Sequence, residues 1–269
     1  LGDVYKRQDP SYKPEIVFSR SAEDAGKIAE GFMLKRYLVV ACGGDGFINL
    51  IAQKAIECSC KIAILPFGRG NDFARSLNLH KLDNAVNAIR NGNFKSVSYL
   101  NVVFSNNGRI SLTNAGVGLL SEASFRASKI PILKGSLLYA SAALISFINL
   151  KSHRYIVTTE AQKIEMENLI LAGAASYYTG GGMYIAPDAK KFRNKLNLLF
   201  AKKLSRIQAL ILLIKVFSGR HIFHREVTNT HVRRVKIESH SSDQWSSIVS
   251  GDGEYPVSYT HLTLPTNRE

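Results

Sequence analysis

Apolar and polar positions alternate along the first third of the chain in a way that predicts strands and helices in turn. Two runs, Tyr37–Ala41 and Lys61–Leu65, have the continuous hydrophobicity of strands buried on both faces. Apolar residues at helical spacing follow each run, and Ser21–Arg36 predicts a helix before them. Glu15–Ser19 has the composition of a further short strand. Strands that alternate with helices indicate an α/β domain with a parallel sheet and right-handed crossovers.

After about Ser96 the pattern changes to short strand-like segments separated by turns, which predicts a second, mostly antiparallel β domain. These segments are Tyr99–Phe104, Arg109–Gly118, Arg154–Glu160, Asn168–Ala175, Lys195–Lys202 and Arg233–Ser239. Two helical stretches, Leu138–Leu150 and Ser205–Phe217, interrupt them. The second carries Arg206 and Lys215 beside a broad apolar face, which favours a core helix over the alternative, a membrane-facing patch. We expect a cleft between the two domains.

The two ends of the chain look foreign to the protein. Leu1–Gln8 and Val257–Glu269 resemble translated sequencing-adapter DNA, so we treat both as artefacts and exclude them from the fold. The α/β domain is then expected at residues 9–97, truncated at its N-terminus, and the β domain at 98–256, truncated at its C-terminus. Neither foreign end should pack against the core.

The net charge of the chain indicates which classes of partner it favours. The chain has 35 Lys and Arg against 21 Asp and Glu, a net charge of +14, which favours nucleotides, nucleic acids or anionic membranes. It has no aromatic RNA-binding signature and no basic low-complexity tail, so we expect no nucleic-acid partner. Cys42, Cys58 and Cys60 lack a second pair for zinc and indicate free thiols in a reducing cytoplasm. The longest apolar stretch, Ser136–Leu150, is shorter than the ~20 residues of a membrane span.

Two glycine-rich turns follow the two predicted parallel strands. "GGDG" at Gly43–Gly46 and "PFGRGNDFARSL" at Pro66–Leu77 would both lie at the carboxyl edge of the sheet, where such sheets bind ligands. Glycines allow amide N–H groups to approach phosphate oxygens, and a helix N-terminus adds a favourable partial charge. The alternatives are a structural turn with a surface aspartate, and a plain N-cap at Asn71 or Asp72.

Two further motifs lie in the second domain. "TGGGMYIAPDA" at Thr179–Ala189 has three consecutive glycines, which weaken a strand and indicate either a close approach to the cleft or a β-bulge. "SGDGE" at Ser250–Glu254 is by itself a common turn.

In this order and spacing, the four motifs resemble the diacylglycerol kinase catalytic family, which includes bacterial soluble lipid kinases and sphingosine kinases. The resemblance covers Glu15–Glu254, and the GNDFAR and GGGM segments separate the chain from NAD kinases, which share GGDG. It implies an α/β ATP-binding domain followed by a β-sandwich lipid-binding domain, with the active site between them.

The implied activity is that of an ATP-dependent lipid kinase, which transfers the γ-phosphoryl group to the hydroxyl of diacylglycerol or a related lipid alcohol. ATP and Mg2+ are the implied cofactors. The implied partner is a lipid at a membrane surface, with a cytoplasmic, peripherally membrane-associated protein; no oligomeric state is predicted. The alternatives are a catalytically weak lipid- or nucleotide-binding homologue and a sphingoid-base kinase of the same fold.

The resemblance also implies roles for single residues. Glu254 corresponds to the general base, with Asp252 as its neighbour and Asp45 as the third catalytic residue. A carboxylate in this role accepts the lipid hydroxyl proton while magnesium and backbone amides stabilise charge on the transferred group. The nucleotide-binding positions are Ser19, Gly43, Gly44, Asp45, Gly46, Phe47, Asn49, Gly68, Arg69, Gly70, Asn71 and Asp72. Asp45, Arg69, Asn71 and Glu254 should face one interdomain cleft.

The chain departs from the family pattern at several positions. Phe47 and Arg69 each replace a threonine, and Leu50 stands where an acidic residue is common. Arg193 and Asn194 stand where the family often has Asp-Gly, whose aspartate helps bind a structural magnesium, so the metal ligands stay unassigned. Arg69 either contacts phosphate directly or marks weakened catalysis. Intact GGDG and DGE motifs favour activity.

Overall fold

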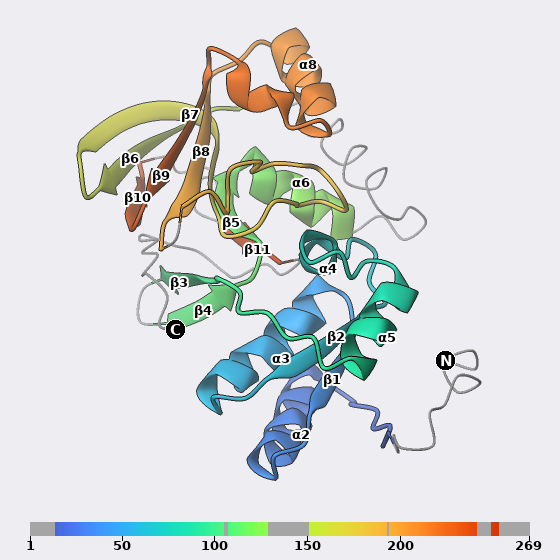
Figure 1. Cartoon of the computed structure of the whole chain (residues 1–269). Helices are drawn as coiled ribbons and strands as arrows, with labels where there is room; N and C mark the ends of the chain where they lie inside the picture. Colours follow the sequence, from blue (N-terminus) through green and yellow to red (C-terminus); the bar gives the residue numbers. More distant parts are fainter. Residues whose placement is uncertain (1–13, 105–106, 129–150, 193, 241–248, 253–269) are drawn as a thin grey trace.

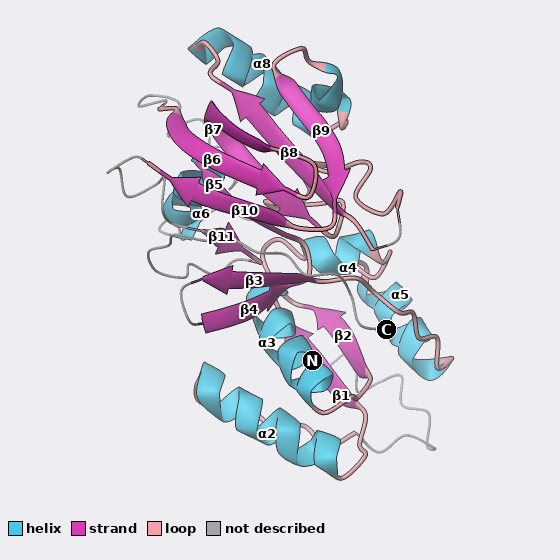
Figure 2. Ribbon diagram, turned by 90° about the vertical axis from the view of Figure 1, so that its left-hand side faces the viewer, coloured by secondary structure: helices cyan, strands magenta, loops and turns pink. Residues whose placement is uncertain are grey.

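The computed structural model describes residues 14–104, 107–128, 151–192, 194–240 and 249–252, which form two domains stacked end to end (Figures 1 and 2). A small parallel sheet with its helices forms one end of the molecule, and a large antiparallel sheet forms the other. The hairpin of β3 (Leu100–Phe104) and β4 (Asn107–Ser111) lies between them.

The first domain has the alternating order that its sequence predicts. β1 (Val39–Gly43) and β2 (Ile62–Pro66) pair in parallel, from Val39 opposite Ile62 to Gly43 opposite Pro66. The helices are α2 (Ala22–Leu34), α3 (Asp45–Glu57), α4 (Asp72–Ser76) and α5 (Leu82–Arg90). Because both strands run the same way, the turns that follow them meet at one edge of the sheet.

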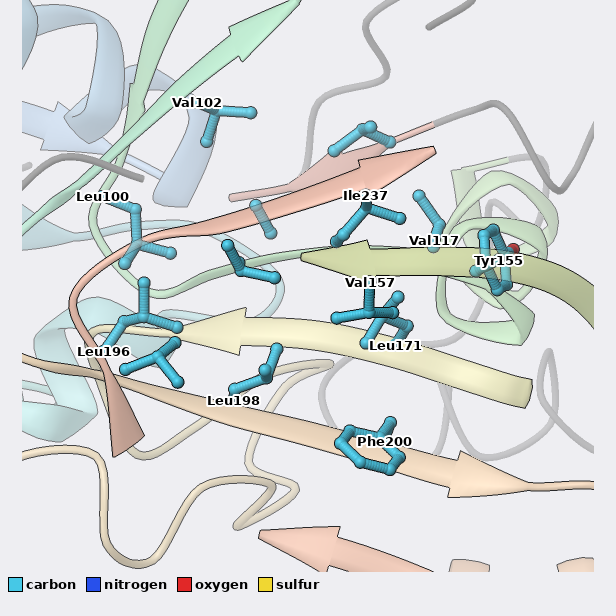
Figure 3. Packing of buried hydrophobic residues seen from close by; sticks show 14 of the residues in the cluster. Leu100, Val102, Val117, Tyr155, Val157, Leu171, Leu196, Leu198, Phe200 and Ile237 are labelled. Carbon is cyan, nitrogen blue, oxygen red and sulfur yellow. The ribbon is translucent and has the colours of Figure 1, made fainter. Parts of the chain in front are cut away.

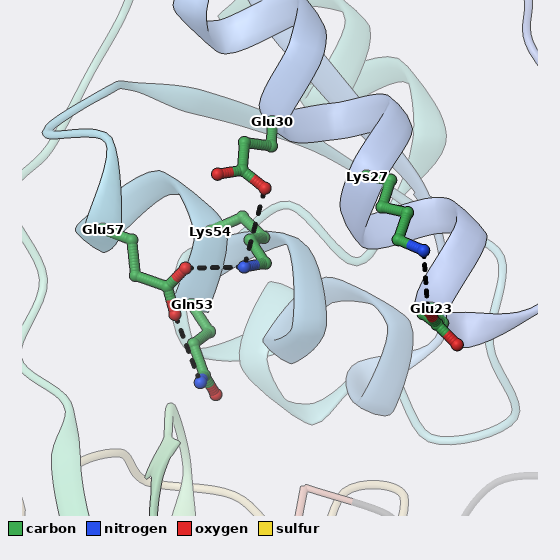
Figure 4. A network of polar contacts seen from close by, with 6 residues as sticks. All are labelled: Glu23, Lys27, Glu30, Gln53, Lys54 and Glu57. Carbon is green, nitrogen blue, oxygen red and sulfur yellow. Dashed lines mark hydrogen bonds and ion pairs between the residues drawn. The ribbon is translucent and has the colours of Figure 1, made fainter.

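Polar contacts join the first two helices of this domain (Figure 4). Lys54 of α3 lies 3.8 Å from Glu30 of α2 and 2.7 Å from Glu57, while Lys27 pairs with Glu23 at 2.7 Å. Exposed ion pairs contribute at most about 1 kcal/mol each. Most of the stabilisation therefore comes from the apolar cluster of α2, α3 and the sheet, whose buried members include Ala25, Ala29, Met33, Ala41, Ile48, Ile51, Ala52, Ala55, Ile64 and Phe73.

The second domain is built on a seven-stranded sheet whose pairings are all antiparallel. Its strands are β5 (Asn114–Gly118), β6 (His153–Thr159), β7 (Lys163–Ala174), β8 (Leu196–Lys202), β9 (Val227–Val232), β10 (Val235–Ser239) and β11 (Ser250–Gly251). Tyr155, Val157, Leu171, Leu198 and Ile237 project from β6, β7, β8 and β10 into one apolar cluster (Figure 3). Alternate residues of these strands face that cluster, as period-2 patterning requires.

The described part of the second domain also contains three helical segments. α6 (Leu119–Ser128) follows β5 directly, and α8 (Arg206–Val216) lies at the end of the molecule far from the parallel sheet (Figure 1). A 3-10 turn, η2 (Arg220–Phe223), follows α8. Within the described residues, no helix is long and apolar enough to cross a membrane.

The predicted fold class is confirmed, and two predicted details are wrong. Glu15–Ser19 forms no strand, and Phe18 in it is 77% exposed, because no described strand pairs with this segment. The run Tyr37–Ala41 is not buried on both faces: β1 begins at Val39, and of its residues only Ala41 is buried. β1 belongs to a sheet with two strands in the described part of the chain, so few neighbours cover it.

Other predicted elements agree in part. The segment expected to be a core helix is α8, but only one side of it is buried, at Ala209, Leu212 and Val216. α6, β9 and β11 have no counterpart among the elements expected from the sequence. The predicted helix Leu138–Leu150 and both foreign-looking ends lie outside the described residues.

Candidate active site between the domains

The two glycine-rich turns touch each other at the carboxyl edge of the parallel sheet. A Cβ atom on Gly68 would lie 2.3 Å from the Cα atom of Gly44, closer than non-bonded carbon atoms can approach. Only glycine at position 68 allows the β2–α4 turn to lie against the β1–α3 turn at this distance. The close approach therefore explains one glycine in each motif.

Asn71 holds the second turn in shape from within. Its backbone adopts the left-handed conformation at a φ of 54°, which asparagine tolerates better than most residues. Its side-chain oxygen accepts from the Gly68 N–H at 2.8 Å, and its amide nitrogen donates to the carbonyl groups of Gly68 at 3.1 Å and Pro66 at 3.3 Å. Asn71 is thus the residue that orders this turn, rather than a side-chain cap of α4.

Two carboxylates face each other beside these turns. A Cβ atom on Gly70 would lie 3.1 Å from Oδ2 of Asp45 and 3.3 Å from Oδ2 of Asp72, so both groups border the same small space. Asp45 accepts from the Phe73 N–H at 3.0 Å. Asp72, which is 6% exposed, accepts from the Gly181 N–H of the second domain at 2.8 Å. The short helix α4 therefore contacts Asp45 through the Phe73 N–H, and it contacts the opposite side of the cleft through Asp72.

Burial and mutual repulsion change the acidity of this pair. Burial, followed by the charge of Asp45, raises the pKa of Asp72 to about 7, against the lowering effects of the Gly181 N–H and the Arg75 guanidinium. Burial also raises the pKa of Asp45, partly offset by backbone N–H groups such as that of Phe73. Two close carboxylates in a site of low polarity favour either a shared proton or a bound cation.

One oxygen of this pair is suited to a cation. Oδ1 of Asp72 is buried and has no hydrogen-bond partner among the described residues. Mg2+ is commonly held by one or two carboxylates together with substrate phosphates, so Asp45 and Asp72 fit such an ion. No group of three or more His, Cys, Asp or Glu side chains in the described ranges is arranged to hold a metal by itself.

Asp252 ties the end of the described chain to both domains. Its carboxylate is buried and accepts from the N–H groups of Leu112 at 2.5 Å and Thr113 at 3.0 Å, from the Thr113 hydroxyl, and from the Asn49 amide at 2.5 Å. Complete burial raises its pKa to about 6, although the hydrogen bonds oppose this rise. With four donors around it, this carboxylate fixes the position of its neighbours.

The carboxylates share one pocket at the domain boundary. It is lined by Asp45, Asp72, Thr113, Asn114, Ser124, Thr179, Gly180, Ser250, Gly251 and Asp252. The glycines at 180, 181 and 182 all have positive φ angles, of 58°, 77° and 119°. They form a tight turn that Thr179 and Met183 close with two backbone hydrogen bonds, and this turn brings the Gly181 N–H to Asp72. The triple glycine therefore serves a close approach to the cleft.

Several predicted site residues lie outside the lining of this pocket. Ser19 is exposed in the segment before α2, and Arg69 is exposed on its turn; neither lines the pocket. Phe47 lies over Gly43, where a Cβ atom would be 2.8 Å from its ring, and it packs against the apolar cluster of the first domain. Asn49 donates to Asp252 and to the Ile110 carbonyl, at 3.0 Å, and so joins the domains.

The remaining predicted positions agree with a site on the two turns. Gly43, Gly44, Gly46, Gly68 and Gly70 all lie on these turns or at the helix starts that follow them. Glu254 lies outside the described residues. The roles of all these residues stay predictions.

Sequence reasoning missed four residues near the carboxylates. Arg75 has a buried Nε atom without a hydrogen-bond partner among the described residues, near Gly182, and its charge acts on Asp72. It stands inside the GNDFAR motif, so its position in that motif was the available signal. Thr113, Asn114 and Ser124 line the pocket from the start of β5 and from α6, and no local pattern distinguishes them.

Comparison with known families agrees with this arrangement. Residues 5–102 match the model of the diacylglycerol kinase catalytic domain. Residues 113–263 match that of the YegS C-terminal NAD kinase beta sandwich-like domain. The two matches follow one another along the chain and meet at the β3–β4 hairpin.

Individual relatives extend over most of the chain. The diacylglycerol kinase of Bacillus subtilis (strain 168) is 24% identical over 94% of this chain and 82% of its own length. That of Mycobacterium tuberculosis (strain H37Rv) is 27% identical over 74% of this chain and 66% of its own. A crystal structure of a protein from Bacillus anthracis str. Sterne has a TM-score of 0.74 at 21% identity, covering 94% of this chain and 83% of the other. At that identity the structural likeness shows the fold alone.

Proposed function

The chain belongs to the diacylglycerol kinase catalytic-domain family and is a lipid kinase, and we propose that it transfers the γ-phosphoryl group of ATP to the hydroxyl of diacylglycerol or a related lipid alcohol. The observation that carries this proposal is the meeting of Asp45, Asp72 and the Gly180 turn at one pocket between the domains, beside the contact of the two glycine turns. Phosphoryl transfer depends mainly on positioning and charge stabilisation, and this pocket offers groups for both.

The two glycine turns supply the binding site for the nucleotide in this proposal. Gly44 and Gly68 lie in contact, so no Cβ atom stands between the two turns where phosphate oxygens would approach the backbone. α3 begins at Asp45, and its N-terminus adds a favourable partial charge for an anion. The Asn71 hydrogen bonds order the second turn before ATP arrives, which lowers the entropy lost on binding.

Asp45 and Asp72 are the residues that would hold Mg2+. Bound there, the ion would neutralise charge on the phosphates of ATP. Arg75 adds a positive charge on the side of Asp72, next to the Gly182 turn. Transfer of a phosphoryl group that carries several negative charges is favoured by this arrangement of cationic and N–H groups.

Glu254 is the proposed general base, and Asp252 is its positioning residue. Asp252 is held by four donors from Asn49, Leu112 and Thr113, so the chain leaves the pocket wall at a fixed point two residues before Glu254. In this proposed role the Glu254 carboxylate would accept the proton of the lipid hydroxyl during transfer.

The direct test is transfer of label from γ-labelled ATP to lipids in mixed vesicles. Diacylglycerol, monoacylglycerol, ceramide and a sphingoid base form the panel, and the control is the same reaction with the Asp45→Asn variant. Labelled phosphatidic acid from diacylglycerol is the expected product. Label on the sphingoid base instead would favour a sphingoid-base kinase. ATP binding without label on any lipid would favour the catalytically weak homologue.

We also propose that α8 and η2 form the surface that meets the membrane. Apolar side chains of this segment are exposed, among them Ile207 at 73%, Ile214 at 68% and Phe223 at 83%. The charged residues in the stretch from Lys203 to Arg225 are all basic. Exposed apolar side chains combined with basic residues complement an anionic bilayer surface.

This surface is connected to the pocket through a short piece of chain. The Tyr184 N–H donates to the Val216 carbonyl at the end of α8 at 3.1 Å, and Gly181, three residues earlier, donates to Asp72. The segment from Gly181 to Tyr184 therefore joins the end of α8 to one wall of the pocket.

Vesicle sedimentation tests the membrane surface. Burying an isoleucine contributes about 1.5–3 kcal/mol, so Ile207→Asp with Ile214→Asp should lower binding to phosphatidylglycerol vesicles more than about tenfold. Leu34→Asp is the matched control, because Leu34 is 69% exposed on α2 at the other end of the molecule. Equal binding of the double variant and the control would contradict the proposed surface.

A further inference from the structure

A second hollow, of about 370 Å³, lies at the junction of the two domains and shares no lining residue with the carboxylate pocket. We call it the junction cavity. Its walls come from Ser76 to Asn78 at the end of α4, from residues 95–100 before and within β3, and from residues 175, 189, 190, 192, 194–196 and 233 of the second domain. An occupant would therefore contact both domains and the chain that joins them.

The charged side chains that line the junction cavity in the described ranges are all cationic: Lys95, Lys190, Lys195 and Arg233. Partial burial lowers the pKa of Lys190, and the charge of Lys95 lowers it further. The Lys190 ammonium also lies 4.8 Å from the centre of the Tyr177 ring. Lys95 and Lys190 lie close enough for their charges to repel one another, and a bound anion would relieve this repulsion.

Two acidic residues near the cavity are engaged outside its lining. Glu160 accepts from the Arg233 N–H at 2.8 Å and from the Arg234 N–H at 3.4 Å. Asp188 accepts from the Asn229 amide at 2.9 Å and lies 3.8 Å from the Lys191 ammonium. Neither carboxylate projects into the cavity as a lining group.

We propose that the junction cavity binds an anion that carries a phosphate group. Lysine and arginine together suit phosphate, which accepts several charge-assisted hydrogen bonds at once. Hydroxyl groups of Ser96 and Tyr99 lie in the same walls and offer further donors. The volume is within the range of small-molecule sites, so it admits a phosphate with a small organic group attached. This proposal does not depend on the kinase reaction.

α4 connects this cavity to the carboxylate pocket. Asp72 begins the helix and Ser76 ends it, and the Ser76 hydroxyl donates to the Asp72 carbonyl at 3.0 Å. Ser76 also bonds to Ser176 of the second domain and accepts from the Lys190 ammonium at 3.4 Å. An anion bound by Lys190 would therefore affect the position of the helix that carries Asp72 and the contact between the domains.

Calorimetric titration with inorganic phosphate tests the site, carried out with a saturating non-hydrolysable ATP analogue so that the glycine turns are occupied. The wild type should bind phosphate under these conditions. Lys95→Ala with Lys195→Ala should bind at least about tenfold more weakly, since each removed charge-assisted hydrogen bond costs a similar factor. Lys35→Ala with Lys163→Ala removes the same charge from exposed positions outside the cavity and should bind like the wild type. Circular dichroism checks folding, and Lys95→Gln with Lys195→Gln replaces the alanine pair if that pair unfolds.

A second experiment, sedimentation with vesicles that contain phosphatidic acid, distinguishes a lipid head group from a soluble phosphate as the ligand. Vesicle binding that falls with phosphate binding in the Lys95 and Lys195 variant identifies a lipid head group. Vesicle binding that stays unchanged while phosphate binding falls identifies a soluble phosphate. Phosphate binding that is equal in both double variants, or that the ATP analogue abolishes, would overturn the proposal.

Discussion

The substitution Asp72→Asn tests two effects of the buried carboxylate pair: how far it lowers the free energy of unfolding, and how much it contributes to catalysis. The pKa of Asp72 rises from 3.8 to about 7, chiefly through burial and then through Asp45. A change of about three units corresponds to about 4 kcal/mol of differential stability between the two protonation states. The asparagine keeps an oxygen for the Gly181 N–H, so the hydrogen bond of 2.8 Å has a substitute acceptor.

The number of protons bound at Asp72 decides whether the free energy of unfolding rises or falls with pH. Between the unfolded pKa of 3.8 and the folded value of about 7, the folded protein binds more protons at Asp72 than the unfolded chain does. This contribution to the free energy of unfolding therefore falls as pH rises. The asparagine variant lacks this dependence, so its advantage over the wild type should grow from under about 1 kcal/mol at pH 4 to about 4 kcal/mol at pH 8.

Urea unfolding at several pH values, without nucleotide or metal, measures this difference. Asp83→Asn, which changes an exposed carboxylate on α5, is the control and should show no such growth between pH 5 and 8. Lipid phosphorylation by Asp72→Asn should fall by about 10²–10³-fold, as for other groups that stabilise charge in the transition state. Equal stability of variant and wild type at pH 8, or full turnover by the variant, would refute the reasoning.

Three further predictions concern the same site. Gly68→Ala should weaken ATP binding and lower the free energy of unfolding by about 1–3 kcal/mol, because its Cβ would collide with Gly44. Gly31→Ala, with open space around it, is the control. Equal ATP affinities of the two variants by calorimetry would contradict this prediction. Asp252→Asn should cost about 1–3 kcal/mol, since an amide would face the Leu112 and Thr113 donors, and urea midpoints unchanged from wild type would count against it. The affinity for Mg2+, measured by calorimetry, should rise with pH through about 7, because the pKa of Asp72 in the metal-free protein is raised to about 7; an affinity that is the same at pH 6 and pH 8 would exclude that dependence.

The first domain and its glycine turns could be predicted because their signals are local. Helical spacing placed α3 after β1, and parallel pairing then brought Gly44 and Gly68 to one edge of the sheet. The long-range contacts gave no such signal. Asn49 and Asp252 meet across the two domains, and nothing near either residue in sequence indicates the other.

Burial was the property that sequence patterns predicted least well. The apolar run of β1 reads as a fully buried strand, yet its exposure depends on how many strands lie beside it, which is a property of the whole sheet. The apolar face of α8 likewise resembles a core-facing surface in sequence, because hydrophobicity alone does not distinguish buried from exposed apolar residues. Phe47 followed the helical pattern correctly, but its position over Gly43 depends on the turn geometry.

The most direct measurement compares wild type and Glu254→Gln in transfer of label from γ-labelled ATP to diacylglycerol in vesicles, with ATP affinity measured in parallel. We expect labelled phosphatidic acid from the wild type. The variant should react about 10²–10⁴-fold more slowly, as for loss of a general base, and its ATP affinity should be unchanged. Equal rates for the two proteins would contradict the role of Glu254. Absence of label on any lipid with the wild type, although ATP binds, would contradict the kinase activity itself.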